Sequence, residues 1–177
     1  MNEKTRELIS TIAYILVVIA ISFLIVRYVG QRTEVIGSSM VPTLEDGDQL
    51  ITDKISYRFR EPQRFDIIVF PYEPAEAFYI KRIIGMPGET VRIEGGRIYI
   101  DDVYLHESYG YGFTDAVDLE GSEVVLGDDE YFVMGDNREV SMDSRYAEVG
   151  SIKRSQLLGR AFVRIFPFNK FGLLKHQ

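Results

Sequence analysis

Residues 36–44 contain two adjacent serines and have the composition expected of a nucleophile loop. Ser38 and Ser39 lie between Gly37 and Pro42. A tight turn of this composition exposes a hydroxyl and can direct a backbone N–H towards the oxyanion that forms when serine attacks a carbonyl. The same residues are also typical of an ordinary turn. This segment alone therefore leaves both interpretations open.

A lysine inside an apolar strand is the second candidate. Lys81 and Arg82 are adjacent within residues 78–84, which are otherwise aliphatic and aromatic. If the strand is central, one of the two cations must point to the less exposed face, whereas on an edge strand Lys81 would extend its ammonium into water. Burial would lower the pKa of Lys81 from about 10.4, because desolvation disfavours the charged form. A neutral lysine of this kind can act as a base.

A third polar cluster, residues 134–145, follows a predicted strand and concentrates acids, guanidinium groups and hydroxyls. Pairs of arginine and carboxylate can lock such a loop, and a hydroxyl such as that of Ser141 can orient a base. The alternative is a solvent-facing loop with local ion pairs.

The composition restricts the chemistry that these clusters can perform. The chain has 177 residues, no cysteine, and two histidines, His106 and His176. This excludes disulfides, zinc-thiolate sites, a cysteine nucleophile and a histidine-rich metal centre, so hydrolysis would depend on carboxylates, lysine or hydroxyls. The net charge of -7 and the pI near 4.9 argue against nucleic acid as a partner.

An uncharged apolar run precedes these clusters. Residues 8–26 are 19 residues long, which as a helix would extend roughly 28 Å, close to the thickness of the hydrocarbon layer of a bilayer. We interpret the run as an uncleaved membrane anchor. A cleavable signal peptide is one alternative, although no small-residue cleavage site follows, and a buried core helix is the other. Charge does not settle the orientation, because basic residues lie on both sides of the run.

The remaining chain has the pattern of a mostly β domain of about 150 residues. We expect strands at residues 49–54, 66–70, 78–84, 90–94, 97–101, 130–134 and 159–165. Gly95 and Gly96 lie between two of them and predict a hairpin, since paired glycines accept the positive φ angles of tight turns.

Two later segments have unusual charge. Residues 101–136 contain eleven acidic residues and no Lys or Arg, and we interpret residues 101–127 as a solvated acidic insertion without a role in catalysis. The acids lack the spacing of a calcium loop. Residues 161–171 are aromatic and basic, and we expect them to close the sheet rather than to lie against anionic lipid headgroups.

Together the three clusters resemble the sequence boxes of bacterial type I signal peptidases, in their small membrane-bound form. The match covers SMVPTL at residues 39–44, KRIIGMPGE at 81–89, and GDNREVSMDSR at 135–145. The boxes occur in the family's order and follow an apolar anchor. The resemblance implies a signal-peptidase-like β-sheet catalytic domain with one N-terminal transmembrane helix.

The resemblance also implies residue roles. Ser39 corresponds to the nucleophile and Lys81 to the general base. Ser141 corresponds to the hydroxyl that hydrogen-bonds the lysine amine and orients it. Asp143 and Arg145 correspond to a supporting ion pair.

Asp136 and Arg138 match positions of the same box and are expected to brace its loop. One position departs from the pattern, because Gly37 stands where some members have a serine that donates a hydrogen bond to the oxyanion. Oxyanion stabilisation would then depend more on the backbone N–H of Ser39, with water or another donor beside it. The resemblance implies no metal and no cofactor.

The expected substrates are secretory preproteins, cut after small residues in an Ala-x-Ala-like pattern at the outer face of the membrane. Residues 1–7 would be cytoplasmic, residues 8–29 would form the anchor in the phospholipid membrane, and residues 30–177 would form the extracytoplasmic domain. A self-cleaving Ser-Lys regulator and a catalytically silent membrane-anchored β module that binds partners are the alternative functions.

Overall fold

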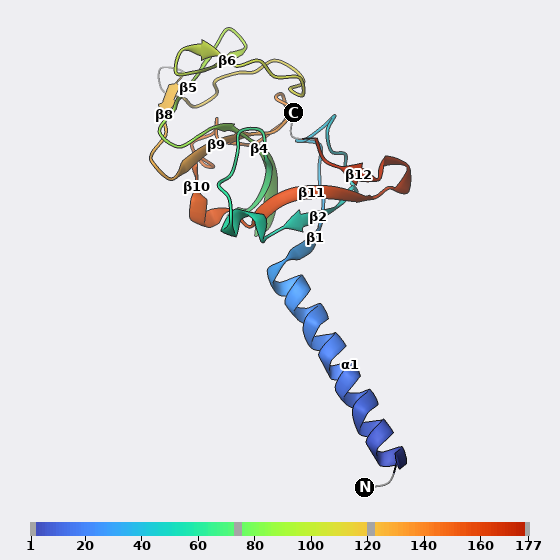
Figure 1. The fold of residues 1–177 in the computed structure, drawn as a ribbon. Coiled ribbons are helices and arrows are strands. Elements are labelled where there is room, and N and C mark those ends of the chain that lie inside the picture. Colours follow the sequence, from blue (N-terminus) through green and yellow to red (C-terminus); the bar gives the residue numbers. More distant parts are fainter. Residues whose placement is uncertain (1–2, 73–75, 120–122, 176–177) are drawn as a thin grey trace.

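The computed structural model describes residues 3–72, 76–119 and 123–175, which form one long helix joined to a β-rich domain (Figure 1). This confirms the predicted mostly β class with an N-terminal apolar helix. The elements in chain order are α1 (Glu3–Tyr28), β1 (Gly30–Glu34), β2 (Gln49–Asp53), the 3-10 turn η1 (Ser56–Arg58), β3 (Ile67–Tyr72), β4 (Ala77–Gly85), β5 (Thr90–Glu94), β6 (Arg97–Ile100), β7 (Val103–Tyr104), β8 (Glu123–Val125), β9 (Glu130–Met134), β10 (Ile152–Lys153), η4 (Arg154–Gln156), β11 (Gly159–Phe166), η5 (Phe168–Lys170) and β12 (Gly172–Leu173).

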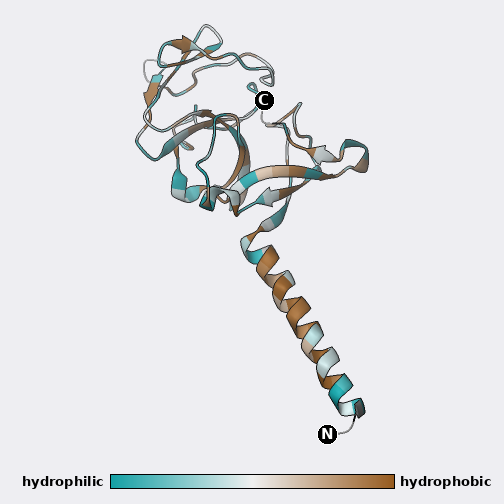
Figure 2. Cartoon of the chain, in the orientation of Figure 1, coloured by the Kyte–Doolittle hydropathy of each residue, from teal (hydrophilic) through white to brown (hydrophobic). Residues whose placement is uncertain are grey.

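Helix α1 extends away from the domain, and its apolar side chains remain exposed (Figures 1 and 2). The segment Lys4–Ile25 is long and apolar enough to cross a membrane. Its 22 residues extend roughly 33 Å, against a hydrocarbon layer of about 30 Å. A core helix would be buried by the domain, so the core-helix alternative for residues 8–26 is wrong.

The larger sheet positions the polar clusters. Its strands follow the order β1-β2-β11-β3-β4-β9-β10, with β12 paired to β11, and neighbouring strands are antiparallel. Strand β4 lies between β3 and β9, with Lys81 opposite Ile68 and Arg82 opposite Met134. Residues 161–171 do contribute to the sheet through β11, as expected.

Strand β4 is covered on both faces. Ile80 packs into one hydrophobic cluster with Leu44 and Val69, while Ile83 packs into another with Phe70. Since successive side chains of a strand point to opposite faces, Lys81 and Arg82 lie on different sides of the sheet. Both are buried, so the structure encloses the arginine as well as the lysine.

The smaller sheet, in the order β7-β6-β5-β8, forms a separate layer at the end of the domain remote from α1 (Figure 1). Its β5–β6 hairpin turns at Gly95 and Gly96, whose φ angles are +57° and +78°. The predicted hairpin is confirmed in position and in its turn residues.

The strands predicted from alternating or apolar runs at residues 49–54, 66–70, 78–84, 90–94, 97–101, 130–134 and 159–165 correspond to β2, β3, β4, β5, β6, β9 and β11, with ends shifted by a few residues. The pattern does not predict β1, β7, β8, β10 and β12. Strand β1 is Gly-Gln-Arg-Thr-Glu, which offers no apolar face, and its backbone pairing with β2 maintains it. The others have two or three residues, too few for a period to show.

Candidate active site

The serine pair lies in a turn between β1 and β2 whose two ends are anchored. Gly37 has φ +88°, and its N–H donates to Asp46 Oδ1 at 2.7 Å. Met40 and Leu44, directly after the pair, are buried in the hydrophobic cluster below. Ser39 is half-buried while Ser38 is exposed, so the geometry distinguishes two hydroxyls that the sequence alone leaves equivalent.

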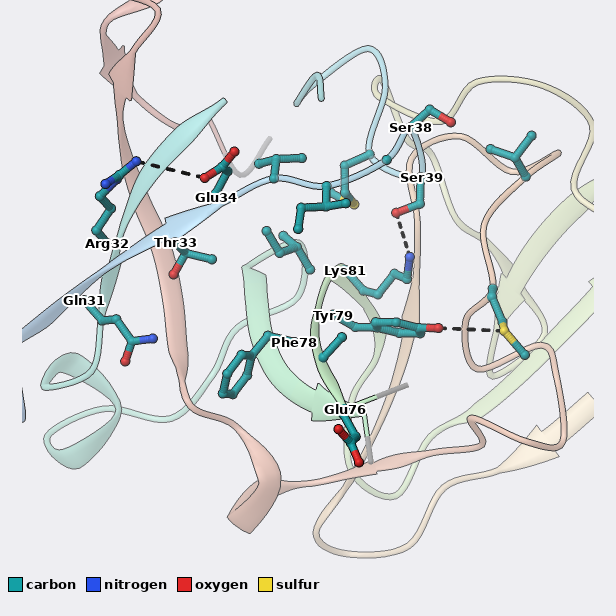
Figure 3. A pocket seen from close by; sticks show the side chains of 18 residues that line it. Gln31, Arg32, Thr33, Glu34, Ser38, Ser39, Glu76, Phe78, Tyr79 and Lys81 are labelled. Carbon is teal, nitrogen blue, oxygen red and sulfur yellow. Dashed lines mark hydrogen bonds and ion pairs between the residues drawn. The ribbon is translucent and has the colours of Figure 1, made fainter. Parts of the chain in front are cut away.

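Lys81 meets this turn from the centre of the sheet. Its side chain is buried, and Nζ donates a hydrogen bond to Ser39 Oγ at 2.7 Å (Figure 3). The ring of Tyr79 lies beside the amine, with its centroid 5.2 Å from Nζ. The edge-strand alternative, in which Lys81 would extend into water, is therefore wrong.

Burial lowers the pKa of Lys81 to about 8 from an ordinary value of 10.5. Desolvation is the main cause, the negative charge of Asp143 opposes it, and the nearby positive charge of Arg145 adds to it. At pH 8 about half of such lysines are neutral, compared with less than 1% of ordinary ones. A neutral amine within hydrogen-bond distance of a hydroxyl can accept its proton.

The third cluster connects to the serine turn through Asn137. The Asn137 N–H donates to the Ser39 carbonyl at 3.0 Å, and its Nδ2 donates to the Ser38 carbonyl at 3.3 Å. Sequence reasoning singles out neighbours of Asn137 in this loop but not Asn137 itself. Its place directly after a strand end and beside Asp136 is the signal that was available.

Gly135 brings Ser141 close to the same turn. The Gly135 N–H lies 3.1 Å from Ser141 Oγ and 3.0 Å from Asp143 Oδ2, and both oxygens accept from it. A Cβ at this position would lie 2.6 Å from Ser141 Cβ and would overlap the Ser39 carbonyl oxygen. No hydrogen bond joins Ser141 to Lys81 among the described residues, so the orienting role of this hydroxyl stays a prediction.

Asp143 and Arg145 form a two-pronged ion pair. Arg145 Nε donates to Asp143 Oδ1 at 2.8 Å, and Nη2 donates to Oδ2 at 3.0 Å. Both side chains are buried, and Arg145 also donates to the carbonyls of Arg138 and Ser141. A pair that is also hydrogen-bonded to the loop backbone holds the loop in one conformation.

Asp136 and Arg138 brace the loop through different partners. Asp136 accepts from Arg82 Nε at 2.8 Å and from Nη2 at 2.6 Å, and both side chains are about 1% exposed. Arg82 was missed as a structural partner, although its place next to Lys81 in an apolar strand indicated that it would need one. Arg138 donates to Glu107 at 2.6 Å and to Thr114 at 3.0 Å.

The contacts of Arg138 correct the interpretation of residues 101–127. Glu107 and Thr114 belong to this segment, and Tyr111 pairs by its backbone with Asp136 and Arg138. Part of the acidic insertion is therefore packed against the loop that contains Ser141, and it is not a purely solvated excursion. The sequence pattern could not show this, because the pairing is backbone to backbone.

An open cleft of about 680 Å³ lies in front of Ser39 and Lys81, between β1 and the first half of β4 (Figure 3). Phe78, Val140 and Met142 contribute apolar surface to it. Among the described residues there is no group of three or more His, Asp or Glu side chains able to hold a metal ion. The cleft can receive an extended chain whose carbonyl carbon reaches the serine hydroxyl.

Comparison of the sequence with known proteins gives a consistent result. Residues 8–166 match the family model described as signal peptidase, peptidase S26. The chain is 43% identical to a probable signal peptidase I-2 of Synechocystis sp. over 83% of its own length and 68% of the relative. It is 34% identical to signal peptidase I T of Bacillus subtilis, over 98% and 93%. A crystal structure of a signal peptidase I from Enterococcus faecalis superimposes with a TM-score of 0.49 at 36% identity, over 57% of this chain and 97% of that one.

Proposed function

This chain belongs to the signal peptidase family, peptidase S26, and we propose that it removes signal peptides through a Ser39–Lys81 dyad while anchored in a membrane by α1. The family makes it a serine endopeptidase that processes signal peptides. The hydrogen bond of 2.7 Å between a buried Lys81 and Ser39 is the observation that carries the assignment of the dyad.

In the proposed reaction the neutral amine of Lys81 takes the proton of Ser39 Oγ as this oxygen attacks the scissile carbonyl. The tetrahedral intermediate collapses to an ester on Ser39, and the lysinium returns its proton to the leaving amine. Water then attacks the ester with Lys81 again as base, which releases the new carboxylate and regenerates the hydroxyl. The low pKa of Lys81 supports both steps, since the amine must be neutral at the start of each.

The oxyanion would be stabilised by the backbone N–H of Ser39, because Gly37 supplies no side-chain donor. Asn137 supports this role indirectly. Its two hydrogen bonds to the carbonyls of Ser38 and Ser39 hold the peptide planes of the turn in place. A rigid turn keeps the donor aimed at one point during the reaction.

We propose that the substrates are secretory preproteins with small residues at an Ala-x-Ala-like site. An extended peptide would lie along the cleft between β1 and β4, where backbone groups at strand edges can pair with it. Apolar side chains such as Phe78 and Met142 suit small apolar substrate residues. The anchor would confine enzyme and membrane-held substrate to one surface, which raises their effective concentration.

The topology in this proposal has residues 1–7 in the cytoplasm, residues 8–29 in the phospholipid membrane and residues 30–177 outside. The exposed apolar surface of α1 supports the spanning role. A silent β module would leave the conjunction of Ser39, Lys81 and a substrate-sized cleft without a use. A self-cleaving regulator would use Ser39 and Lys81 but would have no need of the apolar helix.

The test is incubation of the full chain in detergent with a preprotein. We expect complete loss of cleavage in Ser39→Ala and in Lys81→Ala, and circular dichroism should show that both variants are folded. Ser38→Ala is the matched control and should retain activity, because its hydroxyl does not contact Lys81. Cleavage by a folded Lys81→Ala protein at the normal rate would exclude the dyad.

A further inference from the structure

The base of the domain, where α1 ends, combines positive charge with an exposed aromatic side chain. Arg27 and Tyr28 close the helix, and Lys54, Arg58 and Phe59 come from the segment around η1. We call these five residues the collar. None of them lies in the cleft at Ser39.

Two contacts fix η1 to the end of the helix. The Lys54 N–H donates to the Val29 carbonyl at 2.9 Å. The guanidinium carbons of Arg27 and Arg58 each lie 5.7 Å from the centre of the Tyr28 ring. The ring is therefore shared by a cation of the helix and a cation of the domain, and the depth of Tyr28 determines the depth of Arg58.

That depth follows from the length of the apolar segment. The segment ends at Ile25, and Tyr28 is three residues further, roughly 5 Å along the helix axis. The headgroup layer on each side of a bilayer is about 5–8 Å thick. If the hydrocarbon layer ends at Ile25, Tyr28 lies in the headgroup layer and Arg58 lies in it or at its outer border.

The cations of the collar have no carboxylate partner among the described residues. Lys54 Nζ has an amide neighbour, Gln31 Oε1, at 3.4 Å, and no ion pair in this part of the chain involves Arg27 or Arg58. Nearby Arg60, by contrast, pairs with Asp66 at 3.1 Å. Uncompensated charges at this depth match the phosphates of anionic lipids.

Phe59 adds an apolar group at the same place. It follows Arg58 directly, and 83% of its surface is exposed. Aromatic side chains are favoured at the boundary of headgroups and acyl chains, and basic residues nearby strengthen the contact.

We propose that the collar binds the phosphate groups of anionic phospholipids while Phe59 inserts at the interface, so that the domain is held at a fixed tilt above the bilayer. This inference rests on the membrane-spanning role of α1 within the proposed function. The partner is the lipid surface itself.

The chain contains no tryptophan, so a single Phe59→Trp substitution introduces a specific fluorescent probe. Tyr14→Trp in the middle of α1 reports on insertion of the helix, and Phe113→Trp, 64% exposed in the acidic insertion, is the control remote from the membrane. Each full-length variant is reconstituted into bilayers of phosphatidylcholine or of an equal mixture with phosphatidylglycerol, with brominated lipids as quenchers.

We expect Tyr14→Trp to be quenched in both bilayers by bromine deep in the acyl chains. Phe59→Trp should show blue-shifted emission and quenching by shallow bromine, with a stronger effect in the anionic bilayer, whereas Phe113→Trp should stay unquenched. Adding Arg58→Gln to Phe59→Trp should reduce the anionic preference roughly fivefold, the equivalent of about 1 kcal/mol for one basic residue near the surface. Arg97→Gln, which removes an exposed cation of the small sheet, should leave it unchanged.

Quenching of Tyr14→Trp without any quenching of Phe59→Trp would overturn the inference while leaving the anchor intact. Equal quenching of Phe59→Trp in both bilayers, unaffected by Arg58→Gln, would also overturn the anionic-lipid assignment. Because the readout does not depend on proteolysis, a chain that binds lipid but does not cleave preproteins would contradict only the proposed function.

Discussion

Lys81 combines near-complete burial with a hydrogen bond to a hydroxyl, and both properties follow from its place in β4. Burial disfavours the ammonium form, and this cost of desolvation is what provides a neutral base near physiological pH. The chain has no cysteine, and neither of its two histidines lies in the clusters that form the cleft. At the scale of single residues, the proposed chemistry therefore depends on the protonation state of the Lys81 amine.

The pH dependence of peptide cleavage tests the lowered pKa of Lys81. We predict that kcat/KM rises with pH through a midpoint near 8, because only the neutral amine of Lys81 can accept the serine proton. The measurement is a pH profile with a short peptide substrate. Lys153→Met, which removes an exposed lysine, should leave the midpoint in place, and a flat profile between pH 6 and 10 would contradict the assignment of the base.

Replacement of Lys81 should change stability and activity in opposite directions. Below pH 8 the folded protein carries a buried charged lysine whose pKa shift corresponds to about 3 kcal/mol, so Lys81→Met should raise the free energy of unfolding at pH 7 by up to that amount while abolishing cleavage. Between pH 8 and 10.5 the unfolded state binds more protons than the folded state, so the wild-type chain gains stability as pH rises and the difference disappears. Denaturant unfolding across this range measures both. A less stable Lys81→Met protein at pH 7 would show that the charge is well solvated.

At the scale of elements, the site is an assembly of three segments that meet at Gly135. The serine turn, the centre of β4 and the loop after β9 come from distant parts of the chain, and their contacts are backbone carbonyls and amides as much as side chains. Asp136 forms an ion pair with Arg82 of β4, while Asn137 donates hydrogen bonds to the serine turn. A small displacement of the loop would therefore affect both.

We predict that Gly135→Ala lowers both activity and stability. The added methyl group would overlap the carbonyl oxygen of Ser39 and the side chain of Ser141, which forces the loop away from the turn. Overpacking of this kind typically costs about 1–3 kcal/mol. Gly172→Ala is the matched control, since a Cβ there meets no atom within 4 Å, and similar melting temperatures and rates for the two variants would show that the loop is not tightly held.

The elements differ in how far sequence predicts them. Strands with alternating apolar residues, such as β5 and β6, follow from period alone, and so does the hairpin at Gly95 and Gly96. Strand β1 could not be predicted, because its polar residues are held by pairing with a distant partner. The burial of Arg82 could not be predicted for the same reason, because the residue that compensates its charge, Asp136, is 54 residues away.

The candidate site, too, could be predicted only in part from the sequence. Residue types and box spacing identify Ser39 and Lys81, because chemistry limits which residues can serve as nucleophile and base. The packing of Glu107 and Thr114 against Arg138 lies beyond such reasoning. A segment rich in acids is predicted to be solvated unless the buried guanidinium that it pairs with is known.

At the scale of the whole molecule, the proposed function assigns attachment to the exposed apolar helix and chemistry to the β domain (Figure 1). The cleft opens between β1, which follows α1 directly, and β4. Attachment through α1 therefore keeps the cleft close to the end of the helix. This arrangement suits a substrate that is itself held in the membrane.

Labelling of single cysteines tests the topology, since the natural chain has none. Val103→Cys, at a position 70% exposed in the small sheet, should react with a membrane-impermeant maleimide in intact cells. Arg6→Cys, before the uncharged run of residues 8–26, should react only after permeabilisation. The reverse pattern would place the domain in the cytoplasm and would remove preproteins at the outer face as substrates.

The central claim is that Ser39 becomes acylated with Lys81 as its base, and mass spectrometry of the acid-quenched reaction tests it most directly. We predict an ester between Ser39 and the carboxyl end of the released signal peptide, found on the wild-type chain during turnover. Ser39→Ala and Lys81→Ala should lack it, and Ser38→Ala should retain it. An adduct on another residue, or an adduct of normal yield on Ser39 in Lys81→Ala, would contradict the account.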